Sequence, residues 1–275
     1  TYVFMPSFYS TFLLRNNSTI FSEMTALVES RVFLVGCPRS GTTLLQRILS
    51  SNSQVHSFPE THFFRLAVGR GWRRKLGIVS RRGRFCLSNY MLKIGREDLS
   101  YLIPDRVFFI RPYTKSFVQL LDILTREVKK TIWLEKTPMH LHYIDEISKL
   151  IPRLKFIHVI RDGKDVVTSL YEVTQKYPGA WGGKRSISQC IHRWNSDIKI
   201  SLSMMGHPDH KIISYDYFVD KPDIILKDLC GFIDVPYDHE MLTNRKVFVE
   251  IMLNEEIPWK AGSFGFIKKK RNNRF

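Results

Sequence analysis

The chain carries a strand–loop–helix pattern at residues 32–45, which read Val-Phe-Leu-Val-Gly-Cys-Pro-Arg-Ser-Gly-Thr-Thr-Leu-Leu. Gly36 and Gly41 stand in the G-x-x-x-x-G spacing, and apolar residues four positions apart predict a helix over 43–50. Such a loop directs unpaired backbone N–H groups and the positive end of a helix dipole at one anion. The pattern therefore predicts a loop that binds phosphate or sulfate.

The same loop lacks the lysine that nucleotide hydrolases use. In those enzymes the residue after the second glycine is Lys, which reaches the β- and γ-phosphates. Here that residue is Thr42, between Gly41 and Thr43, and the only cation inside the loop is Arg39, followed by Ser40. This composition points away from ATP hydrolysis.

A second apolar strand, predicted over 156–160, ends at Arg161 and is followed by a helix with Ser169 eight residues later. A phosphomonoester on a ribose is recognised well by a planar, bidentate cation together with a hydroxyl donor. A hydrolase would instead need an Asp at the strand end to hold Mg²⁺. Asp162 comes one residue after that place, so a metal-binding role is poorly placed.

These two segments resemble the 5′-phosphosulfate loop and the 3′-phosphate signature of the sulfotransferases that use 3′-phosphoadenylyl sulfate (PAPS). The resemblance spans about Arg31 to Phe232 and is nearest to the tyrosylprotein and bacterial branches. It implies PAPS as co-substrate, adenosine 3′,5′-bisphosphate (PAP) as product, and no required metal. The implied reaction moves a sulfuryl group to a hydroxyl or amine acceptor by in-line displacement, with Arg39 as one of the catalytic cations.

The segment Pro-Glu-Thr-His-Phe-Phe at 59–64 looks like the Glu-Thr element of the same family, whose Glu is the proposed general base. A hydroxyl becomes nucleophilic only as its proton leaves, so a carboxylate within hydrogen-bond reach suits the chemistry. Glu60 is therefore the predicted base. His56 and His62 are its rivals, because the small-molecule branch of the family uses a His.

Two further residues stand at or just after the ends of predicted strands. By resemblance, Lys136 stabilises charge on the transferring sulfonate, the alternative being a surface pair with Glu135. The segment 213–218 resembles the family's Tyr-Glu-x-Leu segment, and this resemblance implies that Tyr215 lies against the adenine, with Tyr217 as the alternative. Trp194 is interpreted as a core residue.

The predicted fold is a P-loop-type three-layer α/β fold with a central parallel sheet of about five strands. The predicted strands cover 32–35, 55–58, 131–134, 156–160 and 211–215, and helices are predicted over 165–175, over 186–205 and from Pro222, with Asp220 as its cap. Ligands of such sheets sit beyond the carboxyl ends of the strands. Arg39, Glu60, Lys136, Arg161 and Tyr215 all stand at or just after the end of a predicted strand.

We expect one domain over 1–275, with 1–30 as a leader and 65–118 as an insert that caps the acceptor site. The four cysteines are widely spaced without a metal-ligand pattern and are predicted to be buried thiols. Only two basic segments, 259–262 and 268–270, could form the loop that closes over the 3′-phosphate in the family.

The formal net charge is +16, and residues 65–84 contain eight Lys and Arg without an acid. This segment is either a solvated face or a site for acidic acceptors, nucleic acid or anionic lipid. The prediction is a hydroxyl acceptor of unspecified class, no nucleic acid, no membrane span and a cytoplasmic location; oligomeric state is not predicted. The alternatives are a P-loop kinase or nucleotide hydrolase, and a non-enzymatic basic module that binds polyanions.

Overall fold

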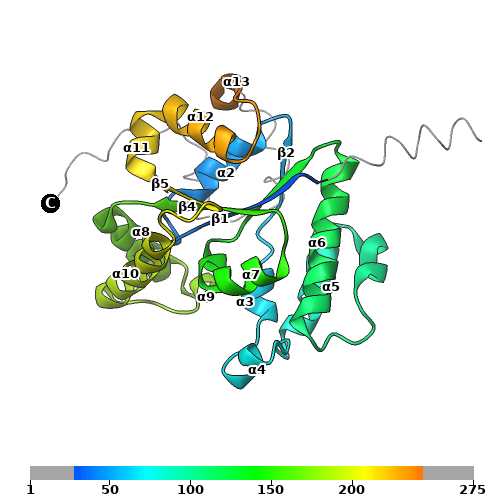
Figure 1. The fold of residues 1–275 in the computed structure, drawn as a ribbon. Helices are drawn as coiled ribbons and strands as arrows, with labels where there is room; N and C mark the ends of the chain where they lie inside the picture. Colours follow the sequence, from blue (N-terminus) through cyan, green and yellow to red (C-terminus); the bar gives the residue numbers. More distant parts are fainter. Residues whose placement is uncertain (1–27, 244–275) are drawn as a thin grey trace, which may run out of the picture.

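The computed structural model describes residues 28–243, and its centre is a single five-stranded sheet (Figure 1). The strand order is β2-β3-β1-β4-β5 and every pairing is parallel. The strands are β1 (Ser30–Gly36), β2 (Val55–Ser57), β3 (Ile132–Lys136), β4 (Leu154–Ile160) and β5 (His210–Ser214). The predicted parallel sheet is confirmed, and each strand lies within two residues of its predicted bounds.

The central strands are apolar on both sides because helices cover both faces of the sheet. One face packs on α2 (Thr42–Ser50), α11 (Tyr215–Asp220) and α12 (Pro222–Phe232), with α13 (Glu240–Thr243) beyond them (Figure 1). Leu45 and Leu49 from α2 and Leu226 and Leu229 from α12 are buried there. The helix after Pro222 was predicted to be capped by Asp220, and this is wrong: Lys221 is its N-cap, without a side-chain cap.

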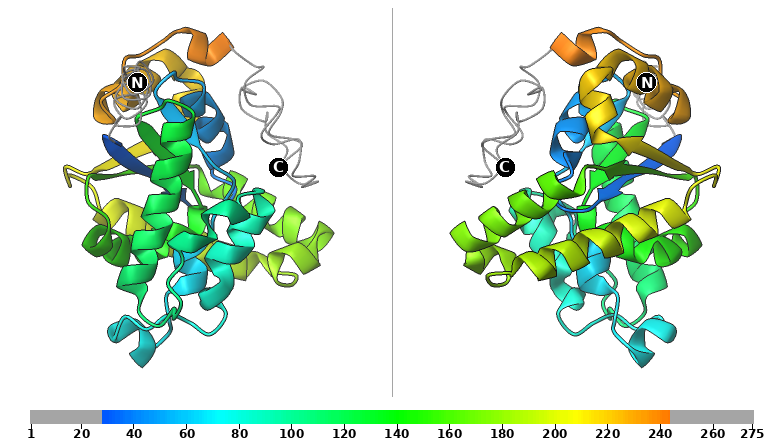
Figure 2. Two further views of the ribbon diagram at one scale, coloured as in Figure 1. Left: turned by 90° about the vertical axis from the view of Figure 1, so that its right-hand side faces the viewer. Right: turned by 90° about the vertical axis from the view of Figure 1, so that its left-hand side faces the viewer.

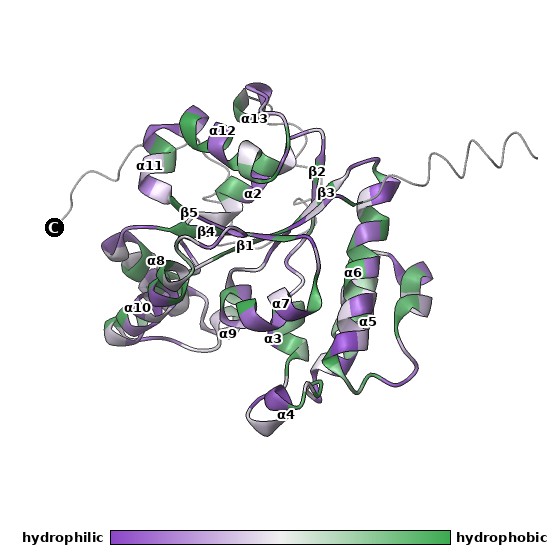
Figure 3. Ribbon diagram, in the orientation of Figure 1, coloured by the Kyte–Doolittle hydropathy of each residue, from purple (hydrophilic) through white to green (hydrophobic). Residues whose placement is uncertain are grey.

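The other face packs on a longer set of helices around an aromatic core. Phe33 lies at its centre, with its ring 5.3 Å from the ring of Trp133 and 5.7 Å from that of Phe156. The covering elements are α3 (Phe63–Ala67), α6 (Ile110–Glu127), the 3-10 turn η3 (Pro138–Tyr143) and α7 (Ile144–Leu150). Along α6, apolar and polar stretches alternate, as expected for a helix with one buried side (Figure 3).

Three helices follow β4 and extend to one side of the molecule (Figure 2). They are α8 (Gly163–Lys176), α9 (Pro178–Trp181) and α10 (Ile187–Ser203), of which α8 and α10 were predicted. Asp162 caps α8 by accepting the Lys164 N–H at 2.9 Å, and Ser186 forms a capping box with Gln189 at the start of α10.

The segment 65–118 contains α4 (Trp72–Lys75), η1 (Gly83–Phe85), α5 (Cys86–Lys93), η2 (Glu97–Leu102) and the first half of α6. Apart from α6, its helices have three to eight residues, which is too short for a clear periodic pattern in the sequence. All four cysteines are buried free thiols, as predicted.

Candidate active site

The carboxyl ends of the five strands bring together side chains that are far apart in the sequence. Because all strands run the same way, these ends meet at one edge of the sheet. Lys136 is the last residue of β3, Arg161 follows β4 and Tyr215 follows β5. All three are predicted site residues. The five residues at this edge are Arg39, Glu60, Lys136, Arg161 and Tyr215.

The loop after β1 has the backbone of an anion cradle. A Cβ added to Gly36 would lie 2.5 Å from the carbonyl oxygen of Val159, so the start of the loop requires glycine. Gly41 has φ +95°, and its Cβ would lie 2.2 Å from ring atoms of Tyr215. The Tyr215 ring therefore lies directly against the glycine at which α2 begins.

The same loop presents polar groups toward the start of α2. Gly41 is the N-cap of α2, which has neither a capping side chain nor an acidic residue in its first turn. Ser40 is fully buried, and its Oγ has no hydrogen-bond partner among the residues that the structure describes. Thr42 is buried and Thr43 half-buried just after it. A buried hydroxyl without a partner at a helix N-terminus is well suited to an anion.

Arg39 contacts the helix that carries the second predicted signature. Its φ is +77°, a left-handed conformation that is uncommon for a residue with a side chain, and its Nε donates to Ser169 Oγ at 2.9 Å. Sequence reasoning assigned these residues to two different phosphate groups. The structure places them side by side.

Arg161 lies over the ring of Tyr215, with its guanidinium carbon 4.5 Å from the ring centroid. One nitrogen pairs with Asp165 at 2.6 Å, whereas Nε is buried and has no hydrogen-bond partner in the described part of the chain. Trp194 donates from Nε1 to the Arg161 carbonyl at 3.2 Å, and its ring packs against Gly163. The sequence pattern predicts Trp194 to be a core residue. In the structure it supports the turn that holds Arg161.

Glu60 and Lys136 form an ion pair at the ends of β2 and β3. Lys136 is 1% exposed, which excludes the alternative of a surface pair with Glu135. His62 Nε2 lies 3.6 Å from Glu60, and burial lowers the pKa of His62 below its ordinary value. His56 instead lies beside Phe58, and burial, with a smaller effect from Lys130, lowers its pKa to about 4.

Several predictions concern other parts of the molecule. The basic segments 259–262 and 268–270 and residues 1–27 of the leader lie outside the described residues. Between residues 28 and 243, no three His, Cys, Asp or Glu side chains are grouped so that they would hold a metal ion. Over the same range, no helix combines the length and apolar character needed to cross a bilayer.

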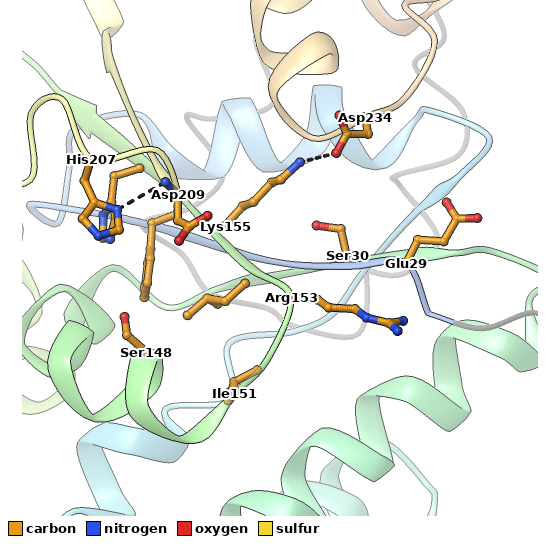
Figure 4. A pocket seen from close by; sticks show the side chains of 12 residues that line it. Glu29, Ser30, Ser148, Ile151, Arg153, Lys155, His207, Asp209 and Asp234 are labelled. Carbon is orange, nitrogen blue, oxygen red and sulfur yellow. Dashed lines mark hydrogen bonds and ion pairs between the residues drawn. The ribbon is translucent and has the colours of Figure 1, made fainter.

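A pocket of about 430 Å³ lies at the opposite edge of the sheet, at the amino ends of β1, β4 and β5 (Figure 4). Its wall mixes both charges, including Arg153 and an ion pair between Lys155 and Asp234. None of the predicted site residues lines it.

The comparisons with known proteins all indicate the same family. The model of the family described as "Sulfotransferase family" matches residues 31–239. The chain is 25% identical over 248 residues to protein-tyrosine sulfotransferase 1 of Danio rerio, covering 88% of this chain and 60% of that protein. It is 24% identical over 247 residues to protein-tyrosine sulfotransferase 1 of Homo sapiens, covering 88% of this chain and 58% of that protein. The chain thus spans about three fifths of the length of these two relatives.

Solved structures resemble the fold. The sulfotransferase domain from the curacin biosynthetic pathway superposes with a TM-score of 0.55 at 22% identity, covering 78% of this chain and 77% of that chain. The sulfotransferase domain from the Synechococcus PCC 7002 olefin synthase gives 0.53 at 21% identity, with the same two coverages. These neighbours support the three-layer α/β fold built around the parallel sheet.

Proposed function

The chain belongs to the sulfotransferase family, and from that membership we propose that it transfers a sulfuryl group from PAPS to a hydroxyl acceptor and releases PAP. The observation that carries the proposal is the meeting of the ion-paired Glu60 and Lys136 with the anion loop at one sheet edge. PAPS supplies the activated sulfuryl group; the protein binds it, orients it and moves one proton.

The residues at the sheet edge fit such a nucleotide. Ser40 Oγ and Arg161 Nε are buried donors without hydrogen-bond partners in the described residues, one beside each predicted phosphate position. Ser40, Gly41, Thr42 and Thr43 would hold the phosphosulfate, as the start of α2 faces it. Arg161 and Ser169 would hold the 3′-phosphate, with Arg39 between the two groups and Tyr215 against the adenine.

The proposed chemistry assigns one task to each side chain of the ion pair. Glu60 accepts the proton of the acceptor hydroxyl while the acceptor oxygen forms its bond to sulfur and the bond from sulfur to the phosphate oxygen breaks. Lys136, together with Arg39, stabilises the negative charge on that departing oxygen. Before this step, the ion pair with the buried Lys136 holds the Glu60 carboxylate at the sheet edge.

We further propose a tyrosyl hydroxyl in an acidic peptide as the acceptor. The relatives named above are protein-tyrosine sulfotransferases, and residues 65–118 contain 13 Lys and Arg but three Asp and Glu. Arg81, Arg82 and Arg84 are exposed there, next to a 64% exposed Phe85. Cationic and aromatic side chains together suit an acidic chain that carries an aromatic residue.

The nucleotide kinase or hydrolase alternative is less well supported. Thr42 takes the place of the phosphate-binding lysine. Asp162, the nearest counterpart of a Mg²⁺-binding carboxylate, uses Oδ1 to cap α8.

Calorimetric titration tests the cofactor, with PAP compared against 5′-ADP and against ATP with Mg²⁺. We expect preference for PAP without metal, because only PAP carries the 3′-phosphate.

Transfer of label from ³⁵S-PAPS to a tyrosyl peptide with acidic flanks, beside the same peptide with neutral flanks, then tests the acceptor. Preference for Mg·ATP would replace the proposal with a phosphoryl-transfer enzyme, and affinity for polyanions without nucleotide selectivity would point to a basic binding module.

A further inference from the structure

Glu135 stands next to Lys136 on β3 and is a fully buried carboxylate, with 0% of its surface exposed. Neighbouring residues on a strand face opposite sides of the sheet, so Glu135 points away from the ion pair that Lys136 makes. Its Oε1 accepts hydrogen bonds from Thr61 Oγ1 at 2.7 Å, from the Thr61 N–H at 3.2 Å and from Thr137 Oγ1 at 2.6 Å. Its Oε2 lies 2.9 Å from His140 Nδ1.

The bonds around Glu135 continue into the start of α3. The Phe64 N–H donates to His140 Nε2 at 3.2 Å, so that nitrogen is unprotonated and the ring proton is on Nδ1, donating to Glu135. The His62 N–H donates to Thr137 Oγ1, and the Phe63 N–H donates to Thr61 Oγ1. The four consecutive N–H groups of 61–64 thus all end in this network. Those of 62–64 belong to the N-cap and first turn of α3, where the helix itself offers them no partner.

The directions of these hydrogen bonds require an ionised carboxylate. Both threonine hydroxyls accept a backbone N–H and donate to Glu135, and His140 donates as well. Glu135 therefore accepts four hydrogen bonds and donates none. Burial raises the pKa of Glu135, whereas the hydrogen bonds from His140 Nδ1–H, Thr137 and Thr61 lower it, and the lowering prevails.

The regular pairing of β2 with β3 ends before Glu60. The last paired residues of β2 and β3 are Ser57 and Leu134. Beyond this pair, the hydrogen bonds from Thr61 to Glu135 connect the residue after Glu60 to the residue before Lys136. One buried oxygen thereby links the two segments that carry the proposed base and the proposed cation.

We propose that Glu135 is a positioning residue that sets the distance and orientation between the Glu60 carboxylate and the Lys136 ammonium; the inference rests on the proposed function of that pair. A buried ionic group is not in general needed for stability, because well-packed apolar residues can replace it at little cost. An apolar residue could not accept the four directed hydrogen bonds that Glu135 accepts. These hydrogen bonds hold the segment that carries Glu60 in a single place before substrate arrives.

Two substitutions of Thr137 test this with little change in volume. Thr137→Val is isosteric but loses the hydroxyl between Glu135 and the His62 N–H, whereas Thr137→Ser keeps the hydroxyl. In the chain of residues 1–275 we expect Thr137→Val to lower kcat for transfer from PAPS about 10- to 100-fold, as a loosened geometry does. The affinity for PAP stays unchanged, and Thr137→Ser recovers most of kcat. Glu135→Gln acts in the same direction as Thr137→Val, since its amide opposes the His140 Nδ1–H.

Hydrogen–deuterium exchange of the peptide 58–66 gives a readout that does not depend on activity. We expect its amides to exchange faster in Thr137→Val than in the wild type and in Thr137→Ser. The matched control is Asp122→Asn, because Asp122 is also a low-exposure carboxylate that accepts from Arg31 and Trp133, at the other ends of the strands. It lowers the melting temperature and leaves both kcat and exchange of 58–66 unchanged.

The outcomes separate this inference from the proposed function. Unchanged kcat and unchanged exchange in Thr137→Val would overturn the positioning role of Glu135. A loss of kcat and PAP affinity together, in proportion to melting temperature, would also overturn it in favour of a purely structural role. A wild-type chain that transfers no sulfuryl group from PAPS would overturn the proposed function, and the exchange comparison would still decide whether the network holds 58–66.

Discussion

Arg39 Nε donates a 2.9 Å hydrogen bond to Ser169 Oγ across 130 positions of sequence. The bond joins the anion loop after β1 to α8, which begins after β4, the neighbour of β1 in the sheet. It brings the guanidinium of Arg39 to the hydroxyl of Ser169, which is assigned to the 3′-phosphate. Arg39 is therefore shared between the predicted positions of the phosphosulfate and the 3′-phosphate.

Ser169→Ala tests the assignment of that hydroxyl. We expect affinity for PAP to fall about 10-fold, the value of one hydrogen bond to a charged group, and affinity for 5′-ADP to change little. Calorimetry with both nucleotides measures this, with Ser203→Ala, an exposed serine on α10, as control. An equal loss for both nucleotides would assign Ser169 to the Arg39 loop instead.

Glu60→Gln tests the proposed base. Turnover should fall about 10²- to 10⁴-fold, because proton removal from the acceptor loses its carboxylate, while PAP binding is retained. Turnover with ³⁵S-PAPS and calorimetry with PAP are the measurements. Unchanged turnover would shift the role to a histidine, and His62→Gln would be the next variant because His62 Nε2 is 3.6 Å from Glu60.

Gly41→Ala tests the cradle. The added Cβ would lie 2.2 Å from the Tyr215 ring, so the loop or the ring must move and PAP binding should be lost. Gly182→Ala is a matched control, since Gly182 also has a positive φ, +73°, but its Cβ would meet nothing within 4 Å. We expect it to cost about 1 kcal/mol of stability, the penalty for a Cβ in a left-handed conformation, and to leave PAP affinity intact. Retained binding in Gly41→Ala would contradict the contact with Tyr215.

The buried pair of His158 and His210 predicts a loss of stability in acid. Burial, with a smaller effect of His210, lowers the pKa of His158 from 6.5 to about 3, and burial with His207 lowers that of His210 to about 4. Unfolding therefore takes up protons below pH 6.5. The free energy of unfolding should fall as the pH drops from 6.5 toward 4, by up to about 1.4 kcal/mol per pH unit for each histidine.

Urea unfolding at several pH values measures this slope. His210→Phe keeps an aromatic ring where His210 stacks on Phe156, 4.6 Å between centroids, and removes one titrating group, so the slope should decrease. His192→Asn, at an exposed position of α10, serves as the control and should leave the slope unchanged. An identical slope in His210→Phe would mean that other groups control the acid sensitivity.

Much of the fold was predictable because it depends on local patterns. Apolar β-branched runs marked the five strands, and leucine spacing marked α2. The cap of α12 was predicted wrongly because a short helix, α11, takes up Asp220 as its last residue. Before α6, the segment 65–118 gave no periodic signal because its helices have only three to eight residues.

The sequence by itself determined which residues reach the carboxyl edge of the sheet, since a residue that follows a parallel strand must lie there whatever its neighbours are. Only the tertiary structure decided how those residues pair: Arg39 with Ser169, Arg161 with Tyr215, and Glu60 with Lys136. It alone revealed the Glu135 network, because a carboxylate on a strand is compatible with surface or core until packing buries it. The physical reason is that strand order and side-chain burial come from contacts between distant segments, which no local pattern encodes.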